Sequence, residues 1–411
     1  KTDYQGQEEW NQTFGGSEDD VGSSVQQTID GGYIVAGTTS PNENGDHNLW
    51  LIKTDSQGQE EWNQTFVGNN NATGKSVQQT VDGGYIVAGG KEGQAWLMKL
   101  DRYGNEEWQN TYTLGDFGYT RSVVQTSNGG YLYASHEGVV KVDSNGVEEW
   151  KNKSNTVGAF PYYEDAIEHS SGNFYAVGGP SGGQGQLVKF SPTGSVLKRK
   201  FYGSKCEDDI FRSIAETLDG MLVVAGEKSH GNQSYDCAFN FMYYKDFWIL
   251  KLKKNGGILW EKTYGGAYME KADDIVVLED GGFGVIGDMC NHGYDIGRCG
   301  PKAKVLFMRL NDSGDLLEEQ EWPGLEFRER LPYFSITTTE NGGIAWTAEH
   351  KNEGTWVHKF GPNETSVSIY PSGYGGFDIN RTTDNGFIIG TWGGRIIKTD
   401  SELNYEALLD E

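Results

Sequence analysis

The sequence predicts an all-β fold, an eight-bladed β-propeller whose blades are four-stranded antiparallel sheets. The first observation is an internal repeat: residues 5–14, QGQEEWNQTF, recur unchanged at 57–66, and residues 30–37, DGGYIVAG, recur at 82–89. The second is composition, because 59 Gly and 12 Trp with only 9 Pro suit many short strands joined by tight turns. A repeat of this length with four strand-like runs is typical of a propeller blade.

A short turn of Asp, Asn or Ser with Gly marks every copy of the repeat and sets the number of blades. Such a turn supplies the positive φ angle that a tight hairpin needs. A ring of seven blades with one copy outside it is the alternative. The eight turns begin at Asp30, Asp82, Asn128, Ser171, Asp219, Asp280, Asn341 and Asp384.

Each unit contains four strand-like runs in a fixed order. The first resembles SVQQT at residues 24–28, and the second, YIVAG at 33–37, follows the Asx-Gly turn. The third is LWLIKTD at 49–55, and after a Gly turn the fourth is EEWNQTF at 60–66. A single unit leaves both of its apolar faces uncovered, so neighbouring units must stack.

One basic residue recurs at the same place in every third strand. We expect it to pair with an Asp or Glu of a neighbouring strand, because one residue per blade does not converge on a small substrate. The Glu-Glu pairs before Trp10, Trp62, Trp108 and Trp150 are interpreted as solvated charge on the outermost strands. The recurring basic residues are Lys53, Lys99, Lys141, Lys189, Lys251, Arg309, Lys359 and Lys398.

The two chain ends both resemble a fourth strand, so the sequence contains nine candidate fourth strands for eight blades. Residues 7–14 match the repeat better, and we expect them to close the ring beside the last blade, residues 378–400. Residues 1–411 then form a single propeller domain. The segment 401–411 is left as a tail, a cap or a contact that links subunits by strand addition, which would make the protein self-assemble through its ends.

Charge and hydropathy exclude two classes of partner. The chain carries 59 acidic and 34 basic residues, a formal net charge of −25, whereas nucleic-acid binding needs a basic surface. No segment approaches the 18 consecutive apolar residues of a membrane-spanning helix. We therefore expect no nucleic acid as a partner and no membrane span.

The four cysteines are confined to one stretch of the chain, which suggests two disulfides and an oxidising compartment. We expect the pairs Cys206–Cys237 and Cys290–Cys299. The first pair joins two long links of one blade. The second closes a short loop, which costs little entropy.

Eight Asn-x-Ser/Thr sequons accompany the cysteines, and together they favour an exported protein that is extracellular or on the cell surface. Glycans are expected on some of Asn63, Asn71, Asn152 and Asn232, which fall on the rim or on long links. Asn380 is expected to be bare, because it falls in an innermost strand.

The repeat resembles the secreted β-propeller repeats of bacterial and archaeal surface proteins, whose units share a DGGYIVAG-like turn and strand and a WLIKTD-like strand. A Gly-x-x-x-Trp step from third to fourth strand is similar to the tryptophan-docking motif of eight-bladed quinoprotein-like propellers, where Trp packs one blade on the next. The resemblance implies the fold and export, and no particular activity. The steps are Gly6/Trp10, Gly58/Trp62, Gly104/Trp108, Gly146/Trp150 and Gly256/Trp260.

No segment predicts a catalytic centre, and no cofactor is expected. Gly179 to Gly183 matches the Gly-x-Ser-x-Gly string of hydrolases, but it falls in a loop between two strands, so we interpret it as a turn. Asn42, Asn44 and Asp46 are oxygen-rich and are candidate calcium ligands, although the distal Glu of an EF-hand loop is missing.

The long links, from strand 4 to strand 1 and from strand 2 to strand 3, are expected on one face, where a ligand would bind. We predict a non-catalytic extracellular module that binds a protein or glycan partner there or joins a surface assembly. The alternative is a secreted propeller enzyme that acts on polysaccharide. The aromatic residues expected on this face are Phe117, Tyr119, Phe160, Tyr162, Tyr163, Tyr268, Phe327, Tyr333, Tyr370 and Tyr374.

Overall fold

The computed structural model describes most of the strands and tight turns, and every regular element in the described part of the chain is a β-strand. Among these residues there is no helix that is long and apolar enough to cross a membrane. The described residues are 12–15, 20–39, 47–67, 72–113, 120–135, 137–153, 161–180, 183–204, 209–230, 244–266, 269–290, 303–325, 335–338, 344–350, 354–361, 364–370, 376–381, 387–391 and 395–399.

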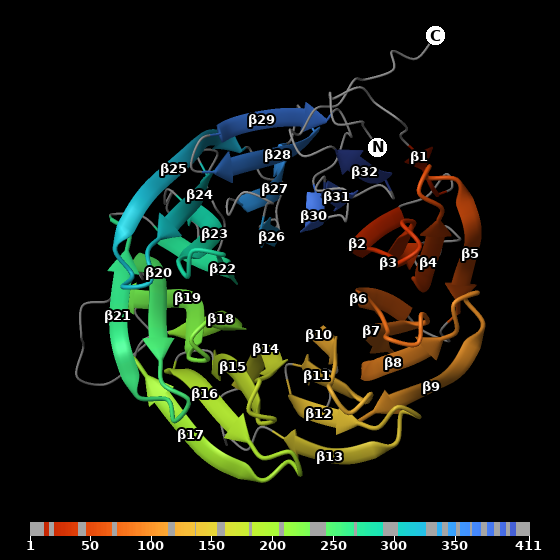
Figure 1. Cartoon of the computed structure of the whole chain (residues 1–411), viewed down its shortest axis with the longest axis horizontal. Coiled ribbons are helices and arrows are strands. Elements are labelled where there is room, and N and C mark those ends of the chain that lie inside the picture. The colour runs from red at the N-terminus through yellow and green to blue at the C-terminus, as the bar shows by residue number, and fades with distance from the viewer. Residues whose placement is uncertain are drawn as a thin grey trace. The chain divides into compact units, whose positions relative to one another are not determined.

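The strands form eight four-stranded antiparallel sheets, which confirms the predicted eight-bladed propeller class (Figure 1). We number the sheets as blades 1 to 8 in chain order. The chain divides into two compact units, of which unit 1 combines Lys1–Val123 with Pro332–Glu411 and unit 2 is Val124–Leu331. The expectation of a single domain stays a prediction.

Unit 1 holds blades 1, 2, 7 and 8, and the division between the units falls within the first strand of blade 3. In blade 8, β1 pairs with β32 in the place of a fourth strand. The strands are β1 (Gln12–Thr13), β2 (Asp20–Gln27), β3 (Tyr33–Thr39), β4 (Asn48–Thr54), β5 (Glu60–Phe66), β6 (Ala72–Gln79), β7 (Tyr85–Lys91), β8 (Gln94–Leu100), β9 (Glu106–Tyr112), β10 (Thr120–Gln125), β26 (Ser335–Thr338), β27 (Ile344–His350), β28 (Gly354–Gly361), β29 (Glu364–Tyr370), β30 (Gly376–Arg381), β31 (Phe387–Thr391) and β32 (Arg395–Thr399).

Unit 2 holds blades 4, 5 and 6 and the rest of blade 3. Blades 5 and 6 share one parallel bridge, Lys245 with Met269. The strands are β11 (Tyr131–Ser135), β12 (Gly138–Val142), β13 (Glu148–Lys153), β14 (Pro161–Glu168), β15 (Phe174–Pro180), β16 (Gly185–Phe190), β17 (Val196–Tyr202), β18 (Ile210–Glu216), β19 (Leu222–His230), β20 (Tyr244–Leu252), β21 (Ile258–Tyr264), β22 (Met269–Val277), β23 (Phe283–Cys290), β24 (Ala303–Leu310) and β25 (Leu316–Leu325).

The chain's first described strand, β1, lies antiparallel to β32, with Gln12 opposite Ile396 and Thr13 opposite Arg395. These residues belong to the segment 7–14, so the pairing joins the N-terminal repeat fragment to the third strand of blade 8. Residues 7–11 of that segment, and the segment 401–411, lie outside the described residues.

The Asx-Gly turns form because one Gly adopts a left-handed backbone. In blade 1 the Thr28 N–H donates to the carbonyl of Gly32 and the Gly31 N–H donates to the carbonyl of Thr28, at 2.9 and 2.8 Å. Gly31 has φ of 83°, which residues with a Cβ rarely adopt. Asp30 closes the turn by accepting from the Gly32 N–H at 2.9 Å. The sequence motif is therefore a tight hairpin, as predicted.

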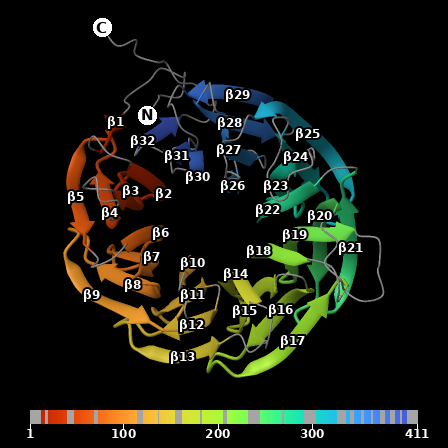
Figure 2. The same ribbon diagram turned by 180° about the vertical axis from the view of Figure 1, so that it is seen from behind.

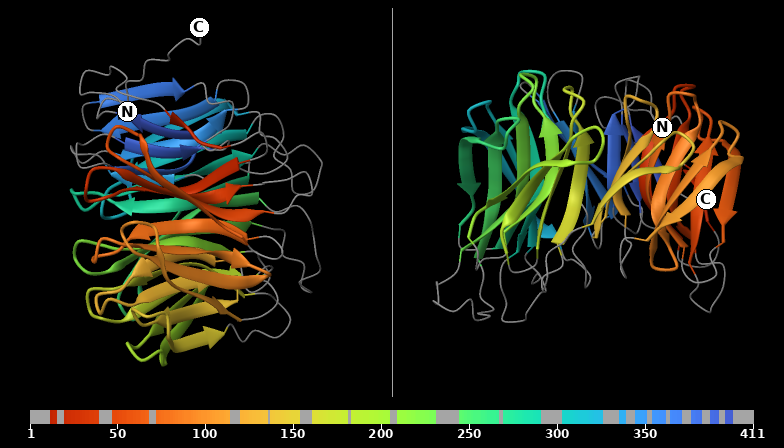
Figure 3. Two further views of the ribbon diagram at one scale, coloured as in Figure 1. Left: turned by 90° about the vertical axis from the view of Figure 1, so that its right-hand side faces the viewer. Right: turned by 90° about the horizontal axis from the view of Figure 1, so that it is seen from below.

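Burial follows the order of strands within a blade. The second and third strands of blade 1 are buried at nearly every position, whereas the fourth strand, β5, alternates between exposed and half-buried positions. Figure 3 shows the blades from the side, with the strands twisting from the first to the fourth. Neighbouring blades of a unit pack face to face: Ile249 and Phe247 of blade 5 share one core with Val285 and Leu306 of blade 6. In blades 1 to 5 the fourth strand is thus the exposed edge of its sheet.

A hydrogen-bonded belt links the first strands of neighbouring blades. In blades 1, 4 and 8 the first strand has a Ser or Asp directly after its β-bulge, and this side chain accepts the backbone N–H of the next blade's first strand. Asp165 accepts from the Ile214 N–H at 3.2 Å, and Ser24 accepts from the Val77 N–H at 3.3 Å. The sequence pattern SVQQT contains this Ser, whose role in joining blades is visible only in the structure.

Asp378 is a member of this belt and gives a testable prediction. Its two oxygens accept from the Val25 N–H at 3.1 Å and from Ser335 Oγ at 2.9 Å. Burial raises the pKa of Asp378 despite these hydrogen bonds. We expect Asp378→Ala to lower the free energy of unfolding by about 2–3 kcal/mol, because two buried donors lose their acceptor. Asp378→Asn, which keeps one acceptor oxygen, should lose less than half as much in chemical denaturation; equal losses would contradict the belt.

Tryptophans of the fourth strands dock on the next blade, as the resemblance implied. Trp150 of blade 3 donates its Nε1–H to the carbonyl of Pro192 at 3.1 Å, and its ring covers Gly194 in the turn between β16 and β17. Trp260 of blade 5 donates in the same way to the carbonyl of Asp312 at 2.9 Å. Gly104 of a Gly-x-x-x-Trp step lies against Trp62 of the preceding blade in the same way, and Gly194 holds the equivalent place in blade 4.

Two links from strand 2 to strand 3 are tight, which corrects the expectation that these links are long throughout. In blade 2 the turn consists of Glu92 and Gly93, whose φ angles of 53° and 75° are both positive. Paired positive angles match the twist of a two-residue hairpin. In blade 3 the link between Ser135 and Gly138 is equally short.

Candidate functional site

The recurring basic residue of the third strand forms an ionic site within its blade. Lys53 is only 1% exposed, and its Nζ lies 3.1 Å from Asp30 and 2.7 Å from Glu61. It also donates to the carbonyl of Thr54 at 2.8 Å. Burial alone would raise the pKa of Asp30, but hydrogen bonds from Thr28, the Gly32 N–H and Lys53 outweigh it and hold the pKa below its usual range.

The same pairing recurs in other blades and confirms the expected structural role. Lys99 contacts Asp82 and Glu107, both at 3.1 Å, and Lys141 contacts Glu149 at 2.8 Å. The second Glu of each of these pairs is exposed on the outermost strand, as interpreted, and it has an additional role. That Glu neutralises the buried Lys from the adjacent strand.

Blade 4 keeps the basic residue but has lost both carboxylates. Ser171 stands where blade 1 has Asp30, and Leu197 stands where it has Glu61. Lys189 forms no ion pair within the described part of the chain. Its Nζ lies 5.4 Å from the centre of the Tyr175 ring, a cation–π distance. The charge of Lys189 is therefore not neutralised by the ion pairs that Lys53 and Lys99 form in their blades.

The edge strand β17 adds more positive charge beside this lysine. Its sequence, VLKRKFY, replaces EEWNQTF of blade 1. Arg199 donates to the amide oxygen of Gln186 at 3.2 Å, and Lys200 donates to the carbonyl of Gly256 at 3.0 Å, so both bind neutral acceptors. Lys198 is exposed. In a chain of net charge −25, this strand is a local cationic patch.

Exposed apolar side chains share the same strand. Val196, Leu197 and Phe201 are 42%, 52% and 47% exposed. Figure 2 shows β17 at the outer edge of its sheet, where it pairs on one side only, with β16. A sheet edge has unpaired backbone N–H and C=O groups that are able to accept another strand.

Blade 5 has a hollow with a volume of about 510 Å³. It is lined by Asp219 and Met221 of the turn between β18 and β19, by Leu259 of β21, and by Lys253, Lys254 and Asn255 of the turn that follows β20. The Lys200 and Tyr202 side chains both reach the carbonyl of Gly256 in that turn. We call β17 together with Lys253, Lys254 and Leu259 the cationic edge.

Blades 5 and 6 share the apolar part of this surface but not its charge. Aliphatic pairs replace the Glu-Glu pair at Ile258–Leu259 and Leu316–Leu317, and each of these side chains is 43–56% exposed. In blade 5, however, Lys251 pairs with Asp219 and with Asp312 of the next blade. The combination of exposed apolar groups and unneutralised cations is thus confined, in the described strands, to blade 4 and the adjoining turn.

A buried cluster of ionisable groups lies where blades 5 and 6 meet. Arg212 pairs with Glu227 at 2.8 Å, and Lys245 contacts the other oxygen at 3.2 Å. Burial would raise the pKa of Glu227, but Arg212 and Lys245 outweigh it and lower the pKa to about 2. Such perturbed groups often mark functional sites, but here they pair with one another. Among the described residues, no group of three or more His, Cys, Asp or Glu side chains is arranged to bind a metal ion.

Glu270 of this cluster has a structural explanation in the repeat. It stands two residues before Ala272, at the position that Asp209 holds in blade 5. Asp209 anchors two backbone segments by accepting from the Ser204 and Ser229 N–H groups, both at 2.8 Å. Glu270 is fully buried, and burial, then the charge of Asp246, raises its pKa to about 7.

This raised pKa gives a pH prediction. Folded Glu270 holds a proton between about pH 4.5 and 7 that the unfolded chain releases, so its contribution destabilises the protein progressively as the pH rises through that window. Glu270→Gln should therefore flatten the decline of unfolding free energy and raise stability at pH 8 by on the order of 1–3 kcal/mol. Part of the pH dependence of the unfolding free energy should remain in this variant, because burial also raises the pKa of Asp288. Denaturation curves from pH 4 to 8 test this, and an unchanged slope would contradict it.

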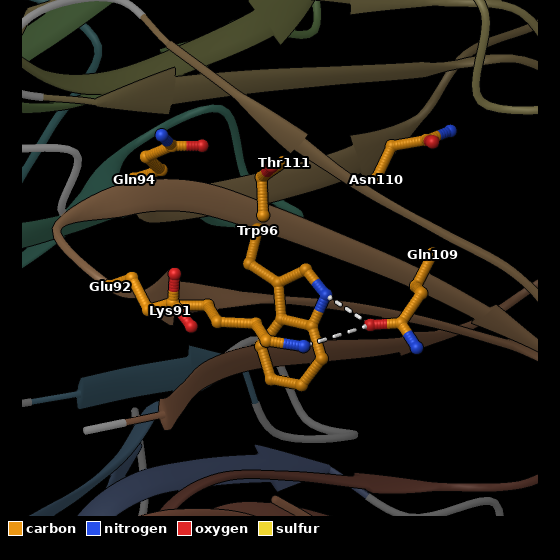
Figure 4. A pocket seen from close by; sticks show the side chains of 7 residues that line it. All are labelled: Lys91, Glu92, Gln94, Trp96, Gln109, Asn110 and Thr111. Carbon is orange, nitrogen blue, oxygen red and sulfur yellow. Dashed lines mark hydrogen bonds between the residues drawn. The ribbon is translucent and has the colours of Figure 1, made fainter. Parts of the chain in front are cut away.

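A polar depression on blade 2 is also part of the repeat (Figure 4). It has a volume of about 380 Å³ and lies beside the tight turn between β7 and β8. Trp96 donates to Gln109 Oε1 at 3.1 Å, and Lys91 Nζ lies 4.8 Å from the Trp96 ring. Blade 1 has the same bond, from Trp50 to Asn63 at 2.8 Å, so this arrangement stabilises blades and is not specific to one ligand.

The aromatic face predicted from the sequence is corrected where the structure describes it. Tyr163 is fully buried in β14, opposite Gly178, where it packs in the core between blades. Tyr162 lies within the same strand and Tyr370 ends β29, so neither lies in a link. The prediction that these residues lie in the links was wrong because these strands begin earlier or end later than their sequence pattern suggests.

Other predicted sites are only partly covered by the described residues. Asn63 is exposed on β5, and Asn152 is half-buried on β13. Asn380 donates its Nδ2–H to the carbonyl of Val25 at 2.8 Å, which agrees with its expected lack of a glycan. Cys290 ends β23. The predicted residues that lie outside the described part are Asn42, Asn44, Asp46, Asn71, Phe117, Tyr119, Phe160, Cys206, Asn232, Cys237, Tyr268, Cys299, Phe327, Tyr333 and Tyr374.

Sequence reasoning missed the cationic edge, although a signal was present. Aligning the eight fourth strands shows that VLKRKFY reverses the charge of EEWNQTF. In the same blade, Ser171 replaces the Asp of the Asx-Gly turn and Leu197 replaces the second Glu of the fourth strand. Only the strand register shows that both losses remove partners of one lysine.

Comparison with solved structures agrees with the fold. The crystal structure of Sqt1 from Chaetomium thermophilum matches with a TM-score of 0.61, over 97% of this chain and 99% of that chain, at 9% identity. The WD40 β-propeller domain of Doa1 (TM-score 0.49, 14% identity, 96% and 98% covered) and the Pan2 WD40 domain of Neurospora crassa (0.46, 11%, 94% and 92%) are also similar. No protein-family model and no curated protein matches the sequence. The chain therefore has a β-propeller fold, and the specific resemblance to secreted surface repeats stays a prediction.

Proposed function

We propose that this protein is a non-catalytic scaffold that binds a protein partner along the outer edges of blades 4, 5 and 6. The observation that carries the proposal is the replacement of the Glu-Glu pair by aliphatic pairs on β17, β21 and β25, which leaves these side chains 42–56% exposed. Exposed apolar groups that recur on consecutive blades favour a protein partner over a glycan, because burying them releases water from apolar surface.

We also propose that the protein works outside the cell. The four cysteines confined to one stretch and the eight sequons support this location. The exposure of Asn63 on β5 leaves room for a glycan there. The intact mass of the protein from its natural source, before and after reduction and deglycosylation, tests this part: a mass that neither treatment changes would contradict it.

Site-specific photo-crosslinking tests the binding surface. A photoreactive residue placed at Val196, Ile258 or Leu316, in the protein's native surroundings, is expected to crosslink to one protein partner. The matched controls are Glu60 and Glu106, which hold the same place in blades 1 and 2 and are exposed. Equal crosslinking at all five positions, or none at the three aliphatic positions, would contradict the proposal.

A further inference from the structure

The cationic edge specifies the chemistry of a chain that would fit it. The strand β17 has a free edge, so it suits an extended segment that adds as a further strand. Its exposed Lys198 calls for acidic side chains, as do Lys200 and Arg199, which within the described part of the chain bind neutral acceptors. Its exposed Leu197 and Phe201 call for apolar side chains between them. A matching segment alternates acidic with apolar residues and contains no Lys or Arg.

The C-terminal segment of this chain has that composition. Residues 401–411 read SELNYEALLDE. They contain four acidic residues, five apolar or aromatic residues and no basic residue. They follow β32 directly, and since β1 already pairs with β32, the repeat leaves no described place in blade 8 for them. The segment resembles a fourth strand without a blade to join.

We propose that β17 of one chain binds the C-terminal segment, residues 401–411, of a second copy of this chain by strand addition. This inference rests on the proposed function, because it names the partner of the cationic edge. β17 has seven residues and spans about 23 Å at ~3.3 Å per residue. Eleven extended residues span up to about 39 Å, so the segment covers β17 and leaves about four residues as a link.

The contact is heterologous, because the edge and the tail are different surfaces of the same chain. Every chain then offers one edge and one tail. Two chains that exchange tails close into a dimer, and successive donation produces an open chain of subunits. Either outcome depends on charge, so association weakens as salt screens the cationic edge.

Complementary variants test the proposal by sedimentation velocity over a range of concentrations. The first variant, Lys198→Glu with Lys200→Glu, keeps the tail and loses the edge. The second, deletion of residues 402–411, keeps the edge and loses the tail. We expect the intact chain to self-associate and each variant alone to associate about tenfold more weakly or worse. An equimolar mixture of the two should recover one-to-one association, because one supplies the edge and the other the tail.

A matched control separates this site from general charge effects. Lys151→Glu with Lys153→Glu on β13 makes the same change in net charge on another exposed fourth strand. It should associate like the intact chain. Lys198→Glu alone, at a side chain with no ion pair among the described residues, guards against misfolding caused by loss of the Lys200 bond to Gly256.

Three results would overturn the inference: an intact chain that stays monomeric, an edge variant that associates like the intact chain, or a mixture that does not recover association. The first of these leaves the proposed function standing if Ile258 and Leu316 still crosslink to a different protein. Loss of those crosslinks together with a monomeric chain would overturn both.

Discussion

Replacing Gly194 by Ala is expected to lower the free energy of unfolding by about 3–4 kcal/mol. Gly194 has φ of 79°, and a left-handed backbone costs a residue with a Cβ about 1–2 kcal/mol. The added Cβ would also overlap the Trp150 ring, which lies on this glycine. Forcing the ring away adds an overpacking cost of about 1–3 kcal/mol, since it is packed between Phe174 and Phe190.

Gly172→Ala is the matched control for this prediction. Gly172 lies in the other tight turn of blade 4, with φ of 75°, and a Cβ there meets no atom within 4 Å. Only the backbone cost applies, so the loss should be about 1–2 kcal/mol. Urea denaturation of both variants measures the difference. Equal losses would show that Trp150 does not dock on Gly194, and the blade-to-blade role of this tryptophan would have to be abandoned.

Lys53→Met is expected to lower the free energy of unfolding by about 2–3 kcal/mol. Met keeps the apolar stem but removes the ammonium group that holds Asp30, Glu61 and the Thr54 carbonyl. Hydrogen bonds to charged groups make a net contribution of about 1.5–3 kcal/mol each. The two carboxylates are 55% and 45% exposed, so water solvates them after the change and limits the loss.

The natural comparison is Lys189→Met in blade 4. Lys189 forms no ion pair in the described part of the chain, so its removal should change stability by less than about 1 kcal/mol. Thermal or chemical denaturation of both variants gives the answer. A loss at Lys189 as large as that at Lys53 would mean that the cationic edge is neutralised within its own chain, and its proposed role in binding would lose its basis.

The repeated parts of the fold were predictable from the sequence because they depend on local chemistry. The Asx-Gly turns, the buried second and third strands and the pairing of Lys53 follow from residues close together in one unit. Contacts between blades were harder to predict from the sequence. Asp378 accepts a hydrogen bond from the Val25 N–H, which lies 353 positions away in the chain, and no local pattern contains such a bond.

The structure corrects one part of the predicted aromatic face for a related reason. We expected aromatic residues near strand ends to be exposed, but Tyr163 lies within the first strand of blade 4 and is buried. The departure from the repeat that supports our proposed site lies on a fourth strand, where Leu197 replaces a Glu that is an ion-pair partner elsewhere. A repeat protein shows its specific site where one copy loses partners that the other copies keep.

Hydrogen–deuterium exchange along β17 tests the central claim, that this edge binds another protein chain, most directly. The protein is compared as isolated in its native assembly and after dispersal by dilution and salt. The account predicts that amides of residues 196–202 exchange about tenfold or more slowly in the assembly, because strand addition satisfies their free N–H groups. Amides of residues 60–66 on β5 should not change. Equal exchange at β17 in both states would contradict the account.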